Sequence, residues 1–235
     1  MLKDIRLVLI GFGNVGRAFA SLLLQKEETL LNEFGIQARV TGIVTKRHGA
    51  SLNSDGIDLA KALALIEGNH SLVELSTHAF NGNTLDFIKA CEADVLVETT
   101  PVNPQAGTPA IDHLRAGFEK GMHGITANKG PVVYAYKKLT ELAQAKGLKF
   151  RFESAVMDGA PIFSLYRKTL AGAEIEGFEG ILNSCTNLLI EAMEAGTPLD
   201  EAIKHAQEIG IAESDPSNDV DGWDAAIKVA ALSTV

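Results

Sequence analysis

Apolar runs and helically spaced apolar residues alternate along the first two thirds of the chain. The segment Ile5–Ile10 is apolar except for Arg6, a pattern typical of a strand buried in a parallel sheet. Apolar residues at helical spacing predict a helix over Val15–Leu24, and Arg39–Val44 predicts a second strand. The further elements expected in this part are a short strand at Ser71–Glu74, a strand at Val95–Glu98, a helix at Pro109–Lys120, a strand at Gly124–Thr126, a helix at Pro131–Lys146 and a strand at Leu148–Glu153. This alternation predicts an α/β fold with a doubly wound parallel sheet.

The pattern changes after Phe152, where mainly helices are expected. The expected elements are a helix at Pro161–Thr169, an extended segment at Ile175–Leu182, a helix at Thr186–Glu194, a helix that begins at Thr197 or Leu199 and ends at Ile209, a polar loop at Gly210–Asp221, and a last helix that begins near Gly222 with Asp221 as its N-cap. We therefore expect a doubly wound domain over residues 1–152 and a smaller α+β domain over residues 153–235.

Composition and length bound the class of protein. The chain has 235 residues, of which 46% are hydrophobic, enough for a packed core, so disorder is not expected. No apolar run approaches the ~20 residues of a membrane span, and we expect no signal peptide before the first predicted strand. The two cysteines are typical of a reducing compartment, so we expect a cytoplasmic protein. A net charge of −9 argues against nucleic acid as the main partner.

A glycine motif lies between the first predicted strand and the first predicted helix. It consists of Gly11, Phe12, Gly13, Asn14, Val15 and Gly16. In dinucleotide-binding folds the first glycine permits a tight turn, the second lets pyrophosphate approach the backbone, and the third lets helix and strand pack closely. The helix N-terminus adds free N–H groups for the phosphates. A glycine-rich turn without a ligand is the alternative, but the strand–turn–helix context predicts a dinucleotide site.

The end of the second predicted strand bears on the choice of dinucleotide. An NAD site usually presents an acidic residue there to the ribose hydroxyls. This chain has Lys46 and Arg47 instead, and two cations suit the 2′-phosphate of NADP. The alternative that both are ordinary surface residues stays open, so NADP is favoured and NAD remains possible. Thr100, which follows the strand at Val95–Glu98, completes the candidate cofactor-binding set.

Two segments carry candidate catalytic residues. Lys129 lies between a predicted strand and the following helix, at the edge where a doubly wound sheet binds ligands. A lysine there can transfer a proton or polarise a carbonyl oxygen, although a single lysine is more often a surface residue. In the last helix Asp224 and Lys228 are four residues apart and share one face. The five carboxylates of residues 213–224 form either a solvated loop or a pocket for a cationic group.

The chain resembles the homoserine dehydrogenase family in segments that span most of its length. These are GFGNVG at 11–16, TANKGP at 126–131, ESAVMDGAPI at 153–162, ILNSCTN at 181–187 and GIAESDPSNDVDGWDAAIK at 210–228. The resemblance implies NAD(P)-dependent interconversion of L-homoserine and L-aspartate 4-semialdehyde, a reaction of threonine, methionine and isoleucine biosynthesis. It also implies a Rossmann cofactor domain, followed by a catalytic domain that makes the contact of a homodimer.

The resemblance also implies roles for individual residues. Lys129 and Lys228 match the two lysines assigned to proton transfer and carbonyl polarisation. The matching acidic residues, which hold the amino and hydroxyl groups of the substrate, are Glu213, Asp219 and Asp224. The implied site for a monovalent cation such as Na⁺ comprises Glu153, Val156, Asp158 and Ala160. The six histidines show no ligand spacing, so we expect no catalytic metal ion.

The sequence departs from the family pattern at two places. Met157 and Asp158 stand where the family commonly has glycines, and residues 183–187 read NSCTN where the family usually has Asn-Gly-Thr-x-Asn. The chain is also short for the family and stops inside an apolar helix pattern, so we expect a C-terminally shortened member. Two alternatives stay open: a dehydrogenase for another small amino acid, and a dinucleotide-binding module without turnover.

Overall fold

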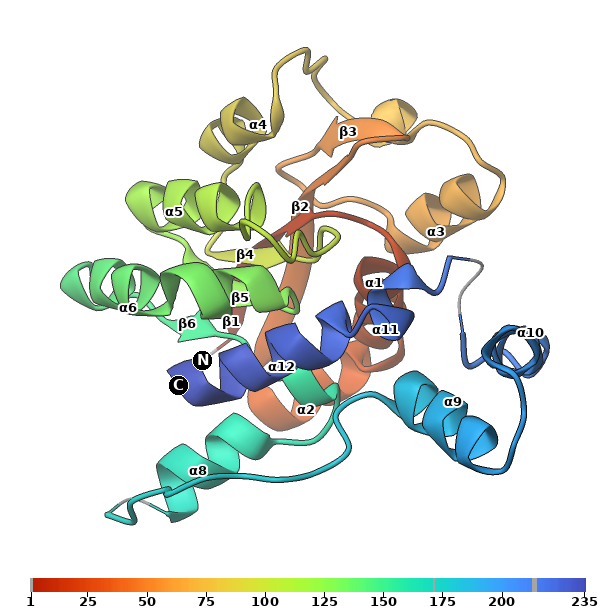
Figure 1. Cartoon of the computed structure of the whole chain (residues 1–235). Coiled ribbons are helices and arrows are strands. Elements are labelled where there is room, and N and C mark those ends of the chain that lie inside the picture. The colour runs from red at the N-terminus through yellow and green to blue at the C-terminus, as the bar shows by residue number, and fades with distance from the viewer. Residues whose placement is uncertain (1, 171, 213–214) are drawn as a thin grey trace.

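A six-stranded sheet with the strand order β3-β2-β1-β4-β5-β6 forms the centre of the fold (Figure 1). The computed structural model describes residues 2–170, 172–212 and 215–235. The strands are β1 (Lys3–Ile10), β2 (Ile36–Thr45), β3 (Gly49–Leu52), β4 (Val95–Glu98), β5 (His123–Thr126) and β6 (Phe150–Arg151). Neighbouring strands are parallel except β2 and β3, which form an antiparallel hairpin. The predicted α/β fold with a doubly wound, mainly parallel sheet is confirmed.

Strand β1 shows why this sequence forms a buried parallel strand. Leu7 and Leu9 belong to the core on one face of the sheet, and Val8 and Ile10 to the core on the other face. All four side chains are at most 6% exposed. Because both faces are covered, the strand is apolar throughout and lacks the alternation of a half-exposed strand.

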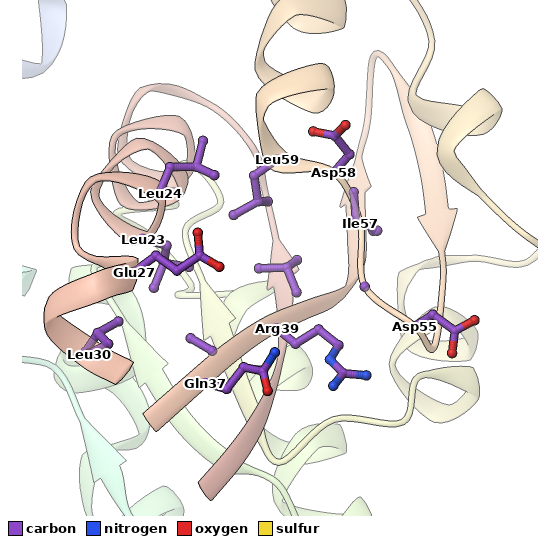
Figure 2. A pocket seen from close by; sticks show the side chains of 13 residues that line it. Leu23, Leu24, Glu27, Leu30, Gln37, Arg39, Asp55, Ile57, Asp58 and Leu59 are labelled. Carbon is purple, nitrogen blue, oxygen red and sulfur yellow. The ribbon is translucent and has the colours of Figure 1, made fainter. Parts of the chain in front are cut away.

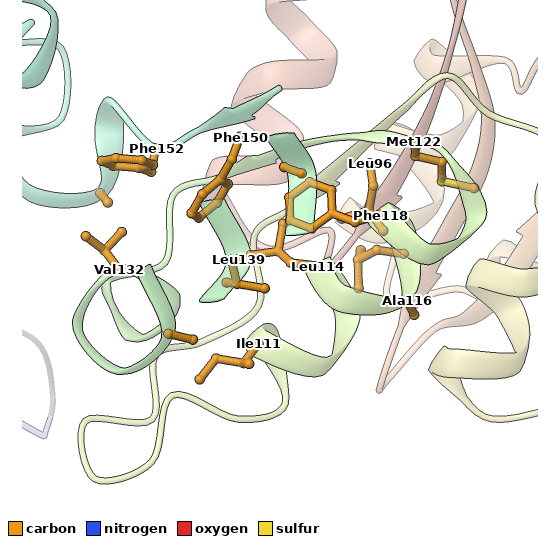
Figure 3. Close-up of a cluster of buried hydrophobic side chains, with 14 of the residues drawn as sticks. Leu96, Ile111, Leu114, Ala116, Phe118, Met122, Val132, Leu139, Phe150 and Phe152 are labelled. Carbon is orange, nitrogen blue, oxygen red and sulfur yellow. The ribbon is translucent and has the colours of Figure 1, made fainter. Parts of the chain in front are cut away.

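Helices cover both faces of the sheet. One face carries α1 (Asn14–Gln25), α3 (Leu59–Glu67) and the 3₁₀ helix η1 (Leu72–Leu75), while α2 (Glu27–Phe34) lies along β2. The other face carries α4 (Thr84–Ala90), α5 (Ala110–Lys120) and α6 (Lys129–Ala145). Figure 3 shows part of this second core, in which Leu96 of β4, Leu114 and Phe118 of α5 and Leu139 of α6 gather. The Phe118 and Phe150 rings meet edge to face, with their centroids 5.8 Å apart.

The winding of the chain changes side at β1, which pairs with β2 on one side and β4 on the other. In such sheets the ligand crevice lies outside the carboxyl ends of the strands at this switch point. Gly11 follows β1 and Thr99 follows β4. These two residues are in contact, because Thr99 Oγ1 donates to the Gly11 carbonyl at 3.0 Å. The functional site is therefore expected at this edge.

Beyond residue 153 the described part of the chain contains helices and irregular segments but no strand. The helices are α7 (Ser154–Met157), α8 (Ile162–Thr169), α9 (Ser184–Glu194), α10 (Leu199–Glu208), α11 (Ser217–Val220) and α12 (Trp223–Thr234). Helices α9 and α10 pack together around a small core that includes Leu189 and Ala206. Helix α12 packs on α6, and its Ala231 joins the larger core beside the sheet. Within the described ranges, none of the helices combines the length and apolar character needed to cross a membrane.

Two expected strands differ in the structure. The segment Ser71–Glu74 is not a strand and forms most of η1, because Ser71 Oγ accepts from the Val73 N–H at 3.2 Å and caps a helical turn. The strand expected at Leu148–Glu153 is reduced to Phe150–Arg151, at the edge of the sheet. Neither change affects the strands that border the switch point.

The acidic segment near the C-terminus is more structured than expected. Helix α11 lies inside the segment Gly210–Asp221 that was expected to be a polar loop. Asp221 is not the N-cap of α12; Gly222 holds that position with φ +76°, a left-handed conformation that glycine adopts without strain. Residues 175–182 form no strand pairing among the described residues.

Candidate active site

The glycine motif forms the turn between β1 and α1. The reason why a glycine is needed differs among its three glycine positions. Gly11 has φ +93°, and a Cβ on it would lie 2.8 Å from the backbone carbon of Thr99. A Cβ on Gly16 would lie 2.8 Å from the Gly11 carbonyl oxygen. The fold itself therefore requires these two glycines. A Cβ on Gly13 would meet nothing within 4 Å, so packing within the chain does not explain that glycine.

The turn fits the pyrophosphate of a dinucleotide. Gly13 is the N-cap of α1 without a side-chain cap bond, and the first turn of α1 holds no acidic residue. Open space above Gly13 and free N–H groups at the helix end allow an anion to approach the backbone. The other predicted residues of the motif divide in environment: Phe12 is buried in the core, Val15 is 52% exposed, and Asn14 Oδ1 accepts from Arg17 Nη2 at 2.7 Å.

Lys46 and Arg47 lie in the turn of the β2–β3 hairpin. Both are exposed, and neither side chain has an ion pair or hydrogen bond with another described residue. The turn follows the carboxyl end of β2, where the Val44 carbonyl accepts from the Gly11 N–H at 2.9 Å. Two unpaired cations next to the glycine turn are suited to a phosphate on the ribose of the cofactor. The preference for NADP stays a prediction.

Two lysines that are far apart in the sequence meet on one carboxylate. Lys129 is the first residue of α6, and its Nζ lies 3.2 Å from Asp224 Oδ1. Lys228 lies one turn after Asp224 in α12, and its Nζ lies 2.7 Å from Asp224 Oδ2. The three side chains are only 18–21% exposed. The structure thus brings both predicted catalytic lysines together where β5 leads into α6.

Asn183, which precedes α9, joins this cluster. Its Nδ2 donates to Asp219 Oδ1 at 2.7 Å and to Asp224 Oδ2 at 2.8 Å. Lys228 Nζ also donates to the carbonyl of Leu182 at 2.7 Å. Asn183 was not among the predicted site residues, although an asparagine shortly before a predicted helix is a typical N-cap, and it does cap α9.

The surroundings of Asp224 favour its charged form. Burial acts to raise the pKa of this carboxyl group, but hydrogen bonds from Lys228 and Asn183 outweigh it, together with the charges of Lys129 and Lys228. The pKa of Asp224 is therefore lower than its ordinary value. A carboxylate paired with two lysine side chains can fix both of them for proton transfer.

The other described carboxylates of residues 215–224 divide between this cluster and solvent. Asp219 is half-buried beside Asn183. Asp215 and Asp221 are exposed. Glu213, the third acidic residue expected to bind the substrate, lies outside the described residues. Of the predicted acidic set, the structure therefore places Asp224 between the lysines and Asp219 next to it, bound to Asn183.

The segment expected to hold a monovalent cation surrounds α7. Glu153 Oε1 accepts from the Ser164 N–H at 3.1 Å, and its Oε2 accepts from the Ser164 hydroxyl at 2.6 Å. Burial acts to raise the pKa of Glu153, but these bonds outweigh it and lower the pKa. The Ala160 carbonyl accepts from a backbone N–H two residues later at 2.9 Å, Asp158 has φ +45°, and Val156 is buried. Cation binding by these residues stays a prediction.

Thr100 is held by residues that the sequence did not single out. Its N–H donates to Glu98 Oε1 at 3.1 Å, and its hydroxyl donates to the same oxygen. Its carbonyl accepts from Asn128 Nδ2 at 3.0 Å. Asn128 is also the N-cap of α6, directly before Lys129, and its residue type was the sequence signal for that role. Glu98, at the end of an apolar strand, carried no comparable signal.

A cleft of about 400 Å³ lies elsewhere, at the amino-terminal half of β2 (Figure 2). Its lining includes Leu23 and Leu30 of α1 and α2, Arg39 of β2, and Ile57 and Leu59. None of the predicted site residues that the structure describes lines this cleft. Because ligands bind at the carboxyl ends of the strands in doubly wound sheets, the cleft is separate from the candidate site.

Two family models match this chain. The model described as "Homoserine dehydrogenase, NAD binding domain" matches residues 11–153, and the model described as "Homoserine dehydrogenase" matches residues 161–235. The NAD(+)-dependent homoserine dehydrogenase of Pseudomonas canavaninivorans is 36% identical over 99% of this chain and 66% of its own length. The homoserine dehydrogenase of Methanocaldococcus jannaschii is 38% identical over 97% of this chain and 67% of its own length. This chain therefore spans about two thirds of the length of these relatives.

Solved structures are similar over nearly the whole chain. A hyperthermophilic archaeal homoserine dehydrogenase in complex with NADPH has a TM-score of 0.84 and 29% identity, over 98% of this chain and 69% of that chain. The homoserine dehydrogenase of Thermoplasma acidophilum has a TM-score of 0.77 and 28% identity, over 96% of this chain and 67% of that chain. The similarity thus includes both the sheet and the helices that follow it.

Proposed function

This chain belongs to the homoserine dehydrogenase family, and we propose that it interconverts L-homoserine and L-aspartate 4-semialdehyde with a nicotinamide dinucleotide. The main support from the structure is the meeting of Lys129, Asp224 and Lys228 at the carboxyl edge of the sheet. Two amino groups and a carboxylate at this edge can bind an amino acid, orient its hydroxyl and exchange its proton.

The proposed roles follow from the chemistry of each group. In the oxidation of homoserine, the alcohol carbon loses a hydride and the hydroxyl loses a proton. When bound, the dinucleotide supplies the hydride acceptor. One of Lys129 and Lys228, after releasing its own proton, takes up the hydroxyl proton, and the other, as a cation, stabilises the carbonyl oxygen that forms. Asp219 and Asp224, together with Glu213, hold the ammonium and hydroxyl groups of the substrate.

The cofactor is proposed to lie across the switch point of the sheet. The turn Gly11–Gly16 would hold the pyrophosphate, and the open space above Gly13 supports this position. Lys46 and Arg47 would bind the 2′-phosphate of NADP, and their exposed, unpaired side chains support that role. Thr100 would line the cofactor side of the crevice. One relative is named as NAD(+)-dependent and one similar structure holds NADPH, so NAD is kept as an alternative.

The domain division and assembly are proposed as well. We place the boundary between a cofactor-binding domain at residues 1–152 and a catalytic domain at residues 153–235, supported by the family models that end at 153 and begin at 161. A homodimer is supported by apolar side chains after the boundary that are 48–68% exposed, namely Leu165, Ile175, Phe178 and Ile181. A monovalent cation at the α7 segment rests on the family resemblance alone.

Homoserine-dependent reduction of NADP, followed by absorbance, tests the proposed reaction. Lys129→Ala and Lys228→Ala are each expected to lower kcat by about 10²–10⁴-fold, the contribution typical of an acid–base group. Lys137 of α6 is 87% exposed and provides the matched control. Lys137→Ala should change kcat by less than about twofold.

Circular dichroism of each variant confirms that the fold is retained. Turnover of another small amino acid, but not of homoserine, would overturn the proposed substrate. Tight NADPH binding without turnover of any small amino acid would overturn the assignment as an enzyme. Losses of kcat in Lys129→Ala and Lys228→Ala no larger than the loss in Lys137→Ala would remove Lys129 and Lys228 from the mechanism.

A further inference from the structure

A buried carboxylate without a part in the proposed reaction lies beside the candidate site. Glu98 is the last residue of β4, and it has no exposed surface. A carboxylate removed from water is costly unless neighbouring groups satisfy it. Its Oε1 accepts from the Thr100 N–H at 3.1 Å and from the Thr100 hydroxyl, and its Oε2 accepts from the Thr126 hydroxyl at 3.0 Å. His113 Nδ1 lies 3.6 Å from Oε1.

Hydrogen bonds connect this carboxylate to the first turn of α6. Thr126 Oγ1, which donates to Glu98, accepts from the Asn128 N–H at 3.0 Å. The Asn128 side chain accepts from the N–H two residues later at 2.9 Å and donates to the Thr100 carbonyl at 3.0 Å. Because Thr100 is itself bound to Glu98, these contacts close a ring. The ring fixes the backbone on both sides of Lys129.

The same strand end contacts the glycine turn. Thr99, the residue after Glu98, donates its hydroxyl to the Gly11 carbonyl at 3.0 Å and its N–H to the Ile10 carbonyl at 2.8 Å. A shift at the end of β4 would therefore displace the glycine turn and the start of α6 relative to each other. Glu98 lies between the two parts of the site that must be in register for hydride and proton transfer.

We propose that Glu98 is a positioning residue, which fixes the first turn of α6, and so Lys129, relative to the glycine turn. This role rests on the proposed function, in which Lys129 exchanges a proton with the substrate. Packing alone does not explain why a glutamate occupies this buried position, because an apolar side chain of similar size would fill the space without burying a charge. A displacement of about 1 Å in a site can lower a rate about a hundredfold.

A double-mutant cycle separates positioning from general stabilisation. Glu98→Gln keeps the volume but replaces one acceptor oxygen with a donor, and Thr126→Val removes the hydroxyl between Glu98 and Asn128. Each is expected to lower kcat about ten- to a hundredfold with little change in the KM for homoserine. In a Lys129→Ala background the same changes should alter the residual kcat less than about twofold, because the position of that amine no longer matters. Equal losses in both backgrounds would overturn the role of Glu98.

Thr140→Val is the matched control for Thr126→Val. Thr140 lies later in α6, and its buried hydroxyl has no hydrogen-bond partner in the described part of the chain. Removing this hydroxyl should therefore leave kcat unchanged. A loss of kcat in Thr140→Val as large as in Thr126→Val would also count against positioning by Glu98.

Hydrogen exchange provides a readout that needs no turnover. In Glu98→Gln the amides of Asn128 and Gly130 should exchange at least about tenfold faster, while the amides of β1 and α3 keep their rates. If Glu98→Gln fails to fold, Thr126→Val carries the same comparison. Wild-type protein that does not oxidise homoserine would refute the proposed function, and exchange would still decide the role of Glu98. Unchanged exchange at Asn128 and Gly130, or faster exchange throughout the sheet, would overturn the positioning role of Glu98.

Discussion

The carboxylate of Asp224 holds together side chains from different parts of the chain. It lies 3.2 Å from Lys129 Nζ and 2.7 Å from Lys228 Nζ, and it accepts a hydrogen bond from Asn183. Without its negative charge, two ammonium groups would remain close together in a site that is mostly shielded from water. The effect of the repulsion would be strong there because burial lowers the effective dielectric constant. Asp224 therefore stabilises the fold as well as the arrangement of the lysines.

Asp224→Asn is expected to destabilise the protein in a pH-dependent way. The pKa of Asp224 is lowered in the folded state, so its charge adds stability above the ordinary carboxyl pKa of about 3.9. That contribution is lost as the pH falls through the lower folded pKa. The free energy of unfolding in urea should fall by about 1–3 kcal/mol at neutral pH. The difference from the wild type should shrink as the pH falls below the ordinary carboxyl pKa of about 3.9.

The exposed Asp221 gives the control for this measurement, because Asp221→Asn removes the same charge from the same acidic segment. It should change the free energy of unfolding little, since exposed charges contribute little. A difference between wild type and Asp224→Asn that stays constant down to acidic pH would contradict the proposed electrostatic origin.

The sequence was better at predicting which residues belong to the site than at predicting which of them are in contact. The spacing of Asp224 and Lys228 was enough to predict that they share a helix face, and the ion pair confirms it. The approach of Lys129 to Asp224 depends on the packing of α12 on α6, which no local pattern encodes. Asn183 and Glu98 were missed for the same reason, because their partners come from distant segments.

At the scale of elements, the glycine turn offers a comparison within one motif. Gly13→Ala meets no atom of the chain, and Gly13 has φ −80°, so the fold should tolerate the change. Its new methyl group would occupy the space proposed for the pyrophosphate. Gly16→Ala places a Cβ 2.8 Å from the Gly11 carbonyl oxygen, so this change should lower the melting temperature.

Fluorescence titration with NADPH and NADH, together with thermal unfolding, tests the two glycine variants. Gly13→Ala should weaken the binding of both dinucleotides at least about tenfold while the melting temperature stays the same or rises slightly. Gly16→Ala should show the lower melting temperature of the two. Unchanged dinucleotide affinity in Gly13→Ala would contradict the placement of the pyrophosphate.

Elements with a strong apolar pattern were predictable, even the four-residue strand β4, and several others were not. The strand Val95–Glu98 matches β4, and the helix predicted at Pro109–Lys120 matches α5 within one residue. Helices α2, α3 and α4 and strand β3 were not predicted. Helix α3 did have a signal, since Asp58 caps it by accepting from the Lys61 N–H at 2.9 Å. Short segments depend on tertiary packing, so their local patterns are ambiguous between helix, strand and turn.

At the scale of the whole molecule, the candidate site joins regions with cores of very different size. Lys129, Asp224 and Lys228 lie on α6 and α12, which share the large core beside the sheet. Asn183 instead caps α9, which packs with α10 around a separate, small core. The buried residues of that small core are Cys185, Leu189, Ala202, Ala206 and Ala212. The α9–α10 pair should therefore open more readily than the sheet, since it buries little apolar surface.

Leu189→Ala and Leu114→Ala test this difference, because both remove a buried leucine, 3% and 0% exposed respectively. Each substitution should cost about 2–5 kcal/mol locally. Leu189→Ala is expected to speed hydrogen exchange in α9 and α10 and to lower homoserine turnover, while NADPH binding and exchange in the sheet stay unchanged. Leu114→Ala should instead speed exchange in β1, β4 and α6 and weaken NADPH binding. Loss of NADPH binding in Leu189→Ala would show that the two cores unfold as one cooperative unit, because damage to the helical pair would then reach the glycine turn.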